Sequence, residues 1–150
     1  MYRRILVPLE REGAPAAHLK HAAELAAQAG AQLTLLRVIA VVPAEEYVMK
    51  RIQIEEGSVG AKSKVAAEDY VHRLTAELRG EGVDAQGMVL VSDQAEDEAI
   101  VVYAAEMECD LIVLPNQRRS LVSRWLQGNV TAKVQRRSDI PVLMVREQQV

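Results

Sequence analysis

The stretch Leu111–Val134, LIVLPNQRRSLVSRWLQGNVTAKV, decides the fold class of this chain. It begins with an unbroken apolar run, Leu111 to Leu114, which is typical of a central strand buried on both faces. A loop and then a helical pattern follow, and many α/β proteins present a loop to a phosphate in this order. Such loops are usually rich in glycine, because backbone amides can then approach the anion closely. Here the loop opens at Pro115, which has no amide hydrogen, and continues through two arginines.

Four other parts of the chain carry similar strand patterns. Ile5 to Leu9 is wholly apolar, and Pro8 lies near its end, where a lost ladder hydrogen bond matters least. Turn-forming residues bound the other runs. The five expected strands are Ile5–Leu9, Gln32–Ile39, Val83–Ser92, Asp110–Leu114 and the segment 139–147.

Helical periodicity occupies the segments between these strands. Gly30 is well placed to end the first helix, and Asp93 with Glu96 three residues later forms a capping-box pattern for another. That later helix has a buried stripe consisting of Ile100, Tyr103, Ala104 and Met107. The expected helices are Ala16–Ala29, Pro43–Glu55, Lys62–Leu78, the one that follows Asp93, and Asn129–Ser138, with a break at 55–60.

The alternation of strands and helices predicts the architecture. It indicates one α/β domain over residues 1–150, with a five-stranded parallel sheet and helices on both faces. Ligands of such folds gather at the carboxyl ends of the strands, near the point where the strand order reverses. Glu10, Val38–Val41 and Pro115–Ser120 fall at expected strand ends, so this edge is where we look for a site.

Composition excludes several classes of function. The net charge of −3 argues against a nucleic-acid binder, which relies on a basic surface. Cys109 is the only cysteine, so no intramolecular disulfide forms, and its place before a strand indicates a small buried thiol. No apolar run approaches the roughly 20 residues that cross a bilayer, and no secretory signal is recognisable. We expect a cytoplasmic protein without membrane contact.

Catalytic patterns are missing from the sequence. No serine lies in a nucleophile-elbow pattern, and neither a Walker motif nor a glycine fingerprint for dinucleotides is present. His18 and His21 lie three residues apart on one expected helix and could share a metal, but surface positions fit them better. Glu10 could hold a metal or activate a water, although a place near a nucleotide or plain solvation suits it as well. We therefore expect no enzyme and no metal site.

Taken together, these segments resemble a universal stress protein domain over nearly the whole chain. The resemblance rests on ILVPLE, LTLLRVIA, SDQAEDEAIVVYAAEMECDLIVLP and IPVLMVR, which occur in the family's order and spacing. It implies a Rossmann-like fold of the adenine-nucleotide alpha-hydrolase kind. It also implies a stress-response or regulatory role through contacts with an unknown protein partner, rather than through chemistry.

The family's nucleotide-binding members carry a loop of Gly, two residues, Gly, nine residues, Gly, then Ser or Thr. That spacing places the glycine positions at Pro115, Arg118 and Gly128, with Asn129 in the hydroxyl position. The resemblance further puts Pro8 and Glu10 at the end of the first strand, where the family has Asp in the place of Glu10. Val38 matches the family's adenine-side valine.

The substitutions predict loss of the family's usual ATP mode. Pro115 removes a donor and makes a positive φ inaccessible, and Arg118 fills space that phosphates would need. Asn129 still caps a helix, and loss of the hydroxyl costs roughly one hydrogen bond, about 1 kcal/mol. We expect no cofactor; the alternative is ATP or AMP held by Gly128, Asn129 and Val130 with Arg118 and Arg119.

Arginines are the basis of that alternative, because they clamp phosphates bidentately. The basic residues of the segment are Arg118, Arg119, Arg124, Lys133, Arg136 and Arg137. The simpler interpretation is that Arg136 and Arg137 complement the C-terminal dipole of the last helix while the others face solvent. The carboxylates between Asp93 and Asp110 likewise complement a helix N-terminus.

The last strand indicates how copies of the chain associate. Pro141, Val142, Leu143, Met144 and Val145 form a short apolar run that would expose unpaired backbone groups at a sheet edge. The resemblance implies a homodimer through this strand, and two-fold antiparallel pairing would cover the edge. A helix or the tail covering the strand is the alternative.

Overall fold

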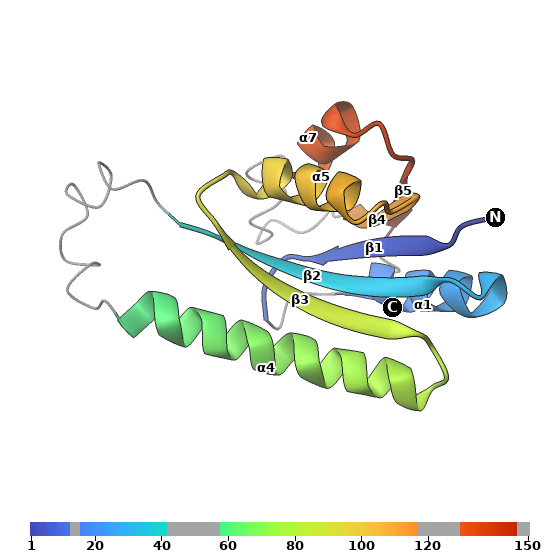
Figure 1. Cartoon of the computed structure of the whole chain (residues 1–150), viewed down its shortest axis with the longest axis horizontal. Coiled ribbons are helices and arrows are strands. Elements are labelled where there is room, and N and C mark those ends of the chain that lie inside the picture. Colours follow the sequence, from blue (N-terminus) through green and yellow to red (C-terminus); the bar gives the residue numbers. More distant parts are fainter. Residues whose placement is uncertain (13–15, 42–57, 117–129, 147–150) are drawn as a thin grey trace.

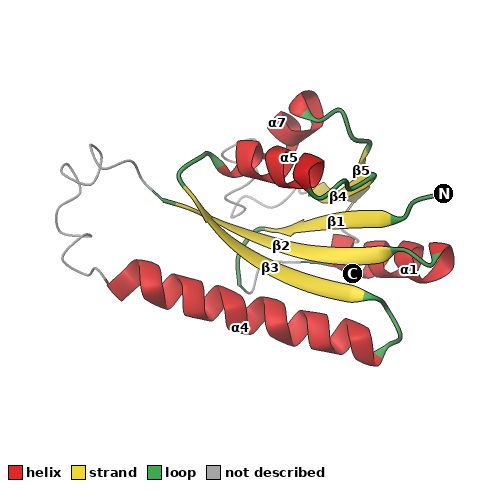
Figure 2. Ribbon diagram, viewed as in Figure 1, coloured by secondary structure: helices red, strands yellow, loops and turns green. Residues whose placement is uncertain are grey.

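A computed structural model of the chain describes residues 1–12, 16–41, 58–116 and 130–146, with only the backbone described for 58–63. It contains a five-stranded, wholly parallel sheet with the strand order β3-β2-β1-β4-β5. Figures 1 and 2 show α1 and α4 on one face of this sheet and α5 and α7 on the other. The predicted fold class is confirmed.

The strands match their predicted positions closely. They are β1 (Arg4–Leu9), β2 (Gln32–Ala40), β3 (Ala85–Ser92), β4 (Leu111–Asn116) and β5 (Val142–Arg146). The central parts of β1, β2 and β4 are buried on both faces, which explains why apolar runs without alternation mark these three strands. β3 and β5 lie at the two edges of the sheet, as predicted for the last strand.

The helices that the structure describes are α1 (Ala17–Ala29), α4 (Ser58–Gly80), α5 (Glu96–Glu106) and α7 (Val130–Arg137). Gly30 has a left-handed φ of 66° and ends α1, as its position after the alanine stripe predicts. The expected break at 55–60 is wrong for its last three residues, which already belong to α4. The expected helix Pro43–Glu55 lies outside the described residues.

The start of α5 differs from the capping-box prediction. Ala95, with an extended backbone, is the N-cap residue and makes no side-chain capping bond. The hydroxyl of Ser92 instead accepts a hydrogen bond from the amide of Gln94 at 3.0 Å, so a serine turn precedes the helix. Met107 is also not part of the buried stripe: it is 41% exposed because the helix ends at Glu106.

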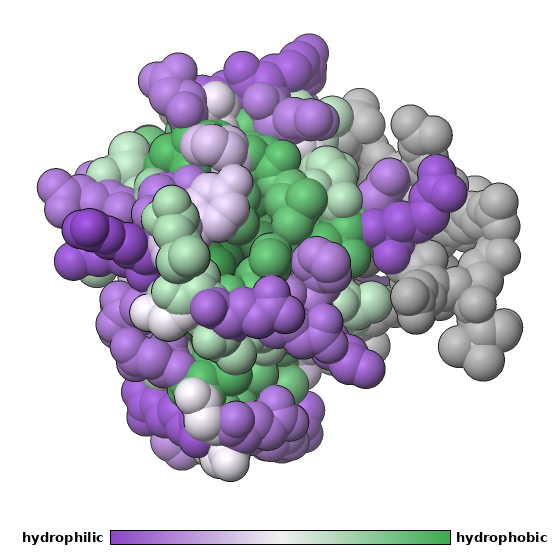
Figure 3. All heavy atoms as spheres, turned by 90° about the vertical axis from the view of Figure 1, so that its right-hand side faces the viewer, coloured by the Kyte–Doolittle hydropathy of each residue, from purple (hydrophilic) through white to green (hydrophobic). Residues whose placement is uncertain are grey.

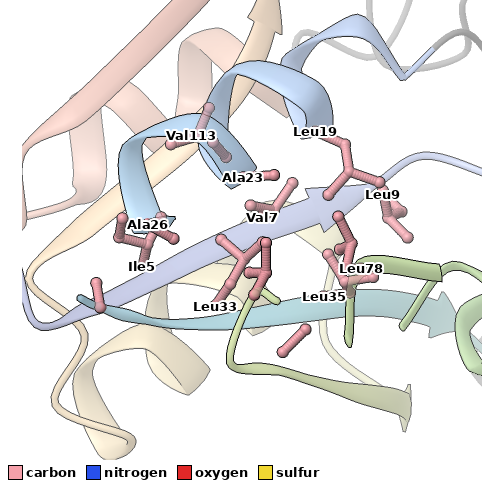
Figure 4. Packing of buried hydrophobic residues seen from close by; sticks show 14 of the residues in the cluster. Ile5, Val7, Leu9, Leu19, Ala23, Ala26, Leu33, Leu35, Leu78 and Val113 are labelled. Carbon is pink, nitrogen blue, oxygen red and sulfur yellow. The ribbon is translucent and has the colours of Figure 1, made fainter. Parts of the chain in front are cut away.

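Two apolar layers hold the sheet between its helices. The layer beneath α1 and α4 is shown in Figure 4, where Ile5 and Val7 of β1 lie between Ala23 of α1 and Leu33 of β2. The layer beneath α5 and α7 contains the buried Leu36, Ile112 and Val134 among others, and the predicted burial of Cys109 is confirmed.

The two ends of the sheet differ in character. Figure 3 views the end at which β1 begins, where hydrophobic residues show between hydrophilic ones. The carboxyl ends of the strands lie at the opposite side, on the left in Figure 1. None of the described helices combines the length and apolar character that crossing a membrane requires.

Candidate functional site

The carboxyl ends of β1, β2 and β4 meet where the strand order reverses. β1 and β2 stay paired as far as Leu9 and Arg37, whereas the register between β1 and β4 stops at Leu6 and Ile112. The ladder between β1 and β4 therefore ends before either strand does. In doubly wound sheets this reversal point is where ligands bind, so the predicted location of the site is consistent with the observed topology.

Pro8 explains part of this early separation, because it has no amide hydrogen to offer to a neighbouring strand. Its carbonyl oxygen lies 2.9 Å from Nε2 of His18, on the first turn of α1. Since the carbonyl can only accept, Nε2 carries the proton and donates it. A helix side chain thus satisfies a backbone group near the end of β1.

His18 is 2% exposed, so the expectation of a surface position is wrong for it, whereas His21 is exposed as expected. Burial lowers the pKa of His18, and the hydrogen bond to Pro8 and the nearby Glu10 carboxylate oppose that shift only in part. Its Nδ1 has no hydrogen-bond partner among the described residues. The spacing 18, 22, 26 along the alanine stripe is the signal that would have placed His18 on the buried face.

Glu10 follows directly on β1 and is 4% exposed. Its extra methylene, compared with the family's aspartate, therefore does not carry the carboxylate out to solvent. Among the described residues, no group of three or more His, Cys, Asp or Glu side chains is arranged to hold a metal ion. The two histidines of α1 do not share an exposed face either, because one is buried and the other is not.

Arg37 is a buried residue near this edge that the sequence reasoning missed. Its Nε lies 3.3 Å from Oε1 of Glu12, and its Nη1 donates to the carbonyl of Val38. Glu12 belongs to the segment that leads from β1 toward α1, so its ion pair with Arg37 links this segment to β2. A lone arginine inside the apolar run LTLLRVIA was the available signal, since a buried charge needs a partner.

The end of β4 runs further than the sequence predicts. Pro115 and Asn116 belong to the strand and stand in register with Val145 and Arg146 of β5. Pro115 is buried, as is Val38 at the end of β2. The residue at the first loop position of the family's pattern therefore lies within the sheet.

The remaining residues of the predicted nucleotide site follow β4 in the sequence. Arg118, Arg119, Gly128 and Asn129 lie outside the described residues. Val130 begins α7 and packs, half-buried, against the apolar layer beneath that helix.

One of the arginines is already engaged elsewhere. Nη1 of Arg137 donates to Oε1 of Glu98 at 2.9 Å, and its Nε lies 3.5 Å from Oδ2 of the buried Asp97. Both carboxylates belong to the first turn of α5, where the helix dipole favours them. Arg137 therefore joins α7 to α5. This pairing argues against a role for Arg137 as a phosphate clamp.

The sequence model of the Universal stress protein family matches residues 1–146 of this chain. The chain belongs to the universal stress protein family. A curated relative, a universal stress protein of Methanocaldococcus jannaschii, is 26% identical over 155 residues, which cover 98% of this chain and 84% of the relative.

Solved structures share the universal stress protein fold. A universal stress protein of Archaeoglobus fulgidus in complex with dAMP superposes with a TM-score of 0.70 at 19% identity, covering 95% of this chain and 97% of that one. Another universal stress protein, in complex with cAMP, gives 0.67 at 22% identity, with 97% of both chains covered. At these identities the likeness establishes the fold, and the nucleotides are properties of those two proteins.

Proposed function

We propose that this chain is a cytoplasmic regulatory module of the stress response that does not bind ATP in the usual mode of its family. The observation that carries the proposal is the position of Pro115. It is a buried residue of β4, in register with Val145, where the family's phosphate loop has its first glycine. A glycine there would offer an amide and adaptable backbone angles; proline offers neither.

Equilibrium binding of labelled ATP tests the proposal. We expect no saturable binding by the unmodified chain, and measurable binding after the double substitution of Pro115→Gly and Arg118→Gly restores the glycines. The single Pro115→Gly variant is the control for a general loosening of β4. Tight binding of ATP by the unmodified protein would overturn the proposal.

The second candidate is a sensor of an adenosine monophosphate. It is favoured by the two structural neighbours that are in complex with dAMP and cAMP. Each of these ligands has one phosphate, so its binding depends less on an intact phosphate loop than the binding of ATP does. Arg118 and Arg119 would clamp the phosphate, with Gly128, Asn129 and Val130 at the start of α7. Thermal unfolding with AMP, dAMP and cAMP is the measurement. A stabilisation that shrinks in Arg118→Ala supports the sensor, and unchanged melting with all three nucleotides excludes it.

The proposal includes no catalytic role. A weak ATP-hydrolysing activity, the remaining alternative, predicts phosphate release that depends on magnesium and is lost in Glu10→Gln. We expect phosphate release at the rate of the buffer blank.

Function then depends on protein contacts. We propose a homodimer through β5, an edge strand whose residues Val142 to Val145 are only half-buried in one copy. A regulatory partner protein would recognise the dimer. Chemical cross-linking and light scattering on the purified chain test the dimer, and a strictly monomeric mass at all concentrations would contradict it.

A further inference from the structure

The opposite edge of the sheet carries a second surface suited to association. β3 is the outermost strand on that side, and no strand in the described part of the chain pairs with its outer edge. A groove of about 490 Å³ lies between β3 and α4, which run side by side in Figures 1 and 2. Its walls include Glu68, Asp69, His72 and Arg79 of α4 and Gly87 and Met88 of β3.

β3 lacks two of the usual protections of an edge strand, a charged side chain and a proline. Its eight residues, AQGMVLVS, contain neither a charge nor a proline. Met88 is 42% exposed and Val91 is 45% exposed. Long, uncharged edge strands of this kind pair readily with other strands, which is why monomeric proteins usually shorten or charge them.

The outward backbone groups of β3 can be identified from the ladder. The amides of Leu33 and Val41 donate hydrogen bonds to the carbonyls of Asp84 and Ser92, so the backbone groups of the even-numbered residues of β3 face β2. Odd-numbered residues face outward, because the direction alternates along a strand. The carbonyl of Ala85 fits this pattern, because it accepts a hydrogen bond from Nε of Arg79 on α4 at 2.7 Å instead of bonding to β2. The outward amides and carbonyls of Gly87, Val89 and Val91 have no strand partner in the described part of the chain and are thus available to another strand.

Charges beside the groove indicate which strand would pair there. Arg79 lies next to Ala85, at the start of β3. Glu68 lies eleven residues earlier in α4, about 16 Å away at the rise of a helix, and therefore level with the later part of β3. Neither Glu68 nor Asp69 pairs with a cation among the described residues. The groove is thus acidic at one end and basic at the other.

We propose that the β3 edge and α4 form an interface with a second copy of this chain, through antiparallel pairing of Ala85–Ser92 about a two-fold axis. Two-fold pairing reverses the second copy, so Arg79 of each copy faces Glu68 and Asp69 of the other. Parallel pairing would instead place Glu68 and Asp69 of one copy against the same two residues of the other. The interface is separate from the dimer proposed at β5.

Cross-linking tests the geometry directly. Met88→Cys places a thiol on β3, and Val102→Cys, on α5, is a matched control because Val102 is 40% exposed. The native Cys109 is buried and does not compete. With a short bis-maleimide, we expect a covalent dimer from the Met88 variant and little from the Val102 variant. Equal yields from both variants would overturn the proposal.

Charge reversal tests the orientation. The double substitution Glu68→Lys with Asp69→Lys should weaken the cross-linked association roughly tenfold, because like charges then face each other. Mixing this variant with an Arg79→Glu variant should restore cross-linking between the two chains. Circular dichroism confirms that each variant is folded. Charge reversal without effect on the yield, or without restoration in the mixture, would rule out the antiparallel arrangement.

Discussion

The buried imidazole of His18 predicts a dependence of stability on pH. Its pKa is lowered in the folded chain, chiefly by desolvation, from an ordinary value of 6.5. As the pH falls below 6.5, the unfolded chain therefore takes up a proton before the folded chain does, and the free energy of unfolding decreases. The loss begins near pH 6.5 and levels off once the pH lies below the lowered pKa.

Urea unfolding at several pH values between 5 and 8 measures this loss. His18→Gln keeps a donor for the Pro8 carbonyl but does not titrate, so its stability should fall less on acidification. His21→Gln, on the same helix but exposed, should behave like the unmodified chain. Identical pH profiles for all three proteins would contradict the assignment.

A second prediction at this scale concerns Gly87. A Cβ built on it would lie 2.4 Å from Cγ1 of Val71 and 2.7 Å from Oγ1 of Thr75, which is held by a bond to the Val71 carbonyl. Gly87→Ala should therefore cost about 1–3 kcal/mol of stability. Combined with Val71→Ala, the loss in urea unfolding should be smaller than the sum of the two single losses. Additive losses would show that α4 simply moves aside.

These residues also show where sequence reasoning stops. Apolar runs and helical stripes locate the strands and helices because each reports which face is buried. They do not reveal that the buried His18 satisfies the carbonyl of Pro8, or that the buried Arg37 pairs with Glu12. Those facts depend on which backbone groups the tertiary structure leaves unpaired.

At the scale of elements, Arg137 adds an ionic link between α7 and the first turn of α5. Arg136 and Arg137 both lie in the last turn of α7, so the helix dipole favours them equally. Only Arg137 reaches the buried Asp97. Arg137→Met should cost roughly 1 kcal/mol, a modest figure because its half-exposed guanidinium is screened by water. Arg136→Met should stay within about 0.5 kcal/mol of the unmodified chain. Equal losses in thermal unfolding would favour the dipole alone.

Elements themselves were easier to predict than their ends. The strand–helix order and every described strand follow from the patterns, whereas the start of α5 and the end of β4 do not. Asp93 and Glu96 satisfy a capping-box pattern, yet the Ser92 hydroxyl forms the turn and moves the helix start to Glu96. Pro115 looks like a loop residue, but an adjacent β5 gives it a strand partner.

For the whole molecule, the decisive feature is that β3 and β5 form two different sheet edges, neither of which pairs with another strand in the described part of the chain. The Pro141 carbonyl accepts from the Ile112 amide, so odd-numbered residues of β5 face β4 and Met144 faces outward. Val91 faces outward from β3 by the same argument. A proline at either position removes an outward amide and leaves the inner ladder intact. Met144→Pro and Val91→Pro therefore block one edge each.

Light scattering over a range of concentrations should then separate the two interfaces. A chain with two two-fold interfaces joins two neighbours, so the mass of the unmodified protein should rise beyond that of a dimer. Each single variant should stop at a dimer, and the double variant should be a monomer with the circular dichroism of the folded chain. A mass that never exceeds a dimer in the unmodified protein, but falls to a monomer in Met144→Pro, would leave β5 as the interface and eliminate β3. The reverse loss, with Val91→Pro alone giving a monomer, would eliminate β5 instead, because only the blocked edge can hold the two copies together.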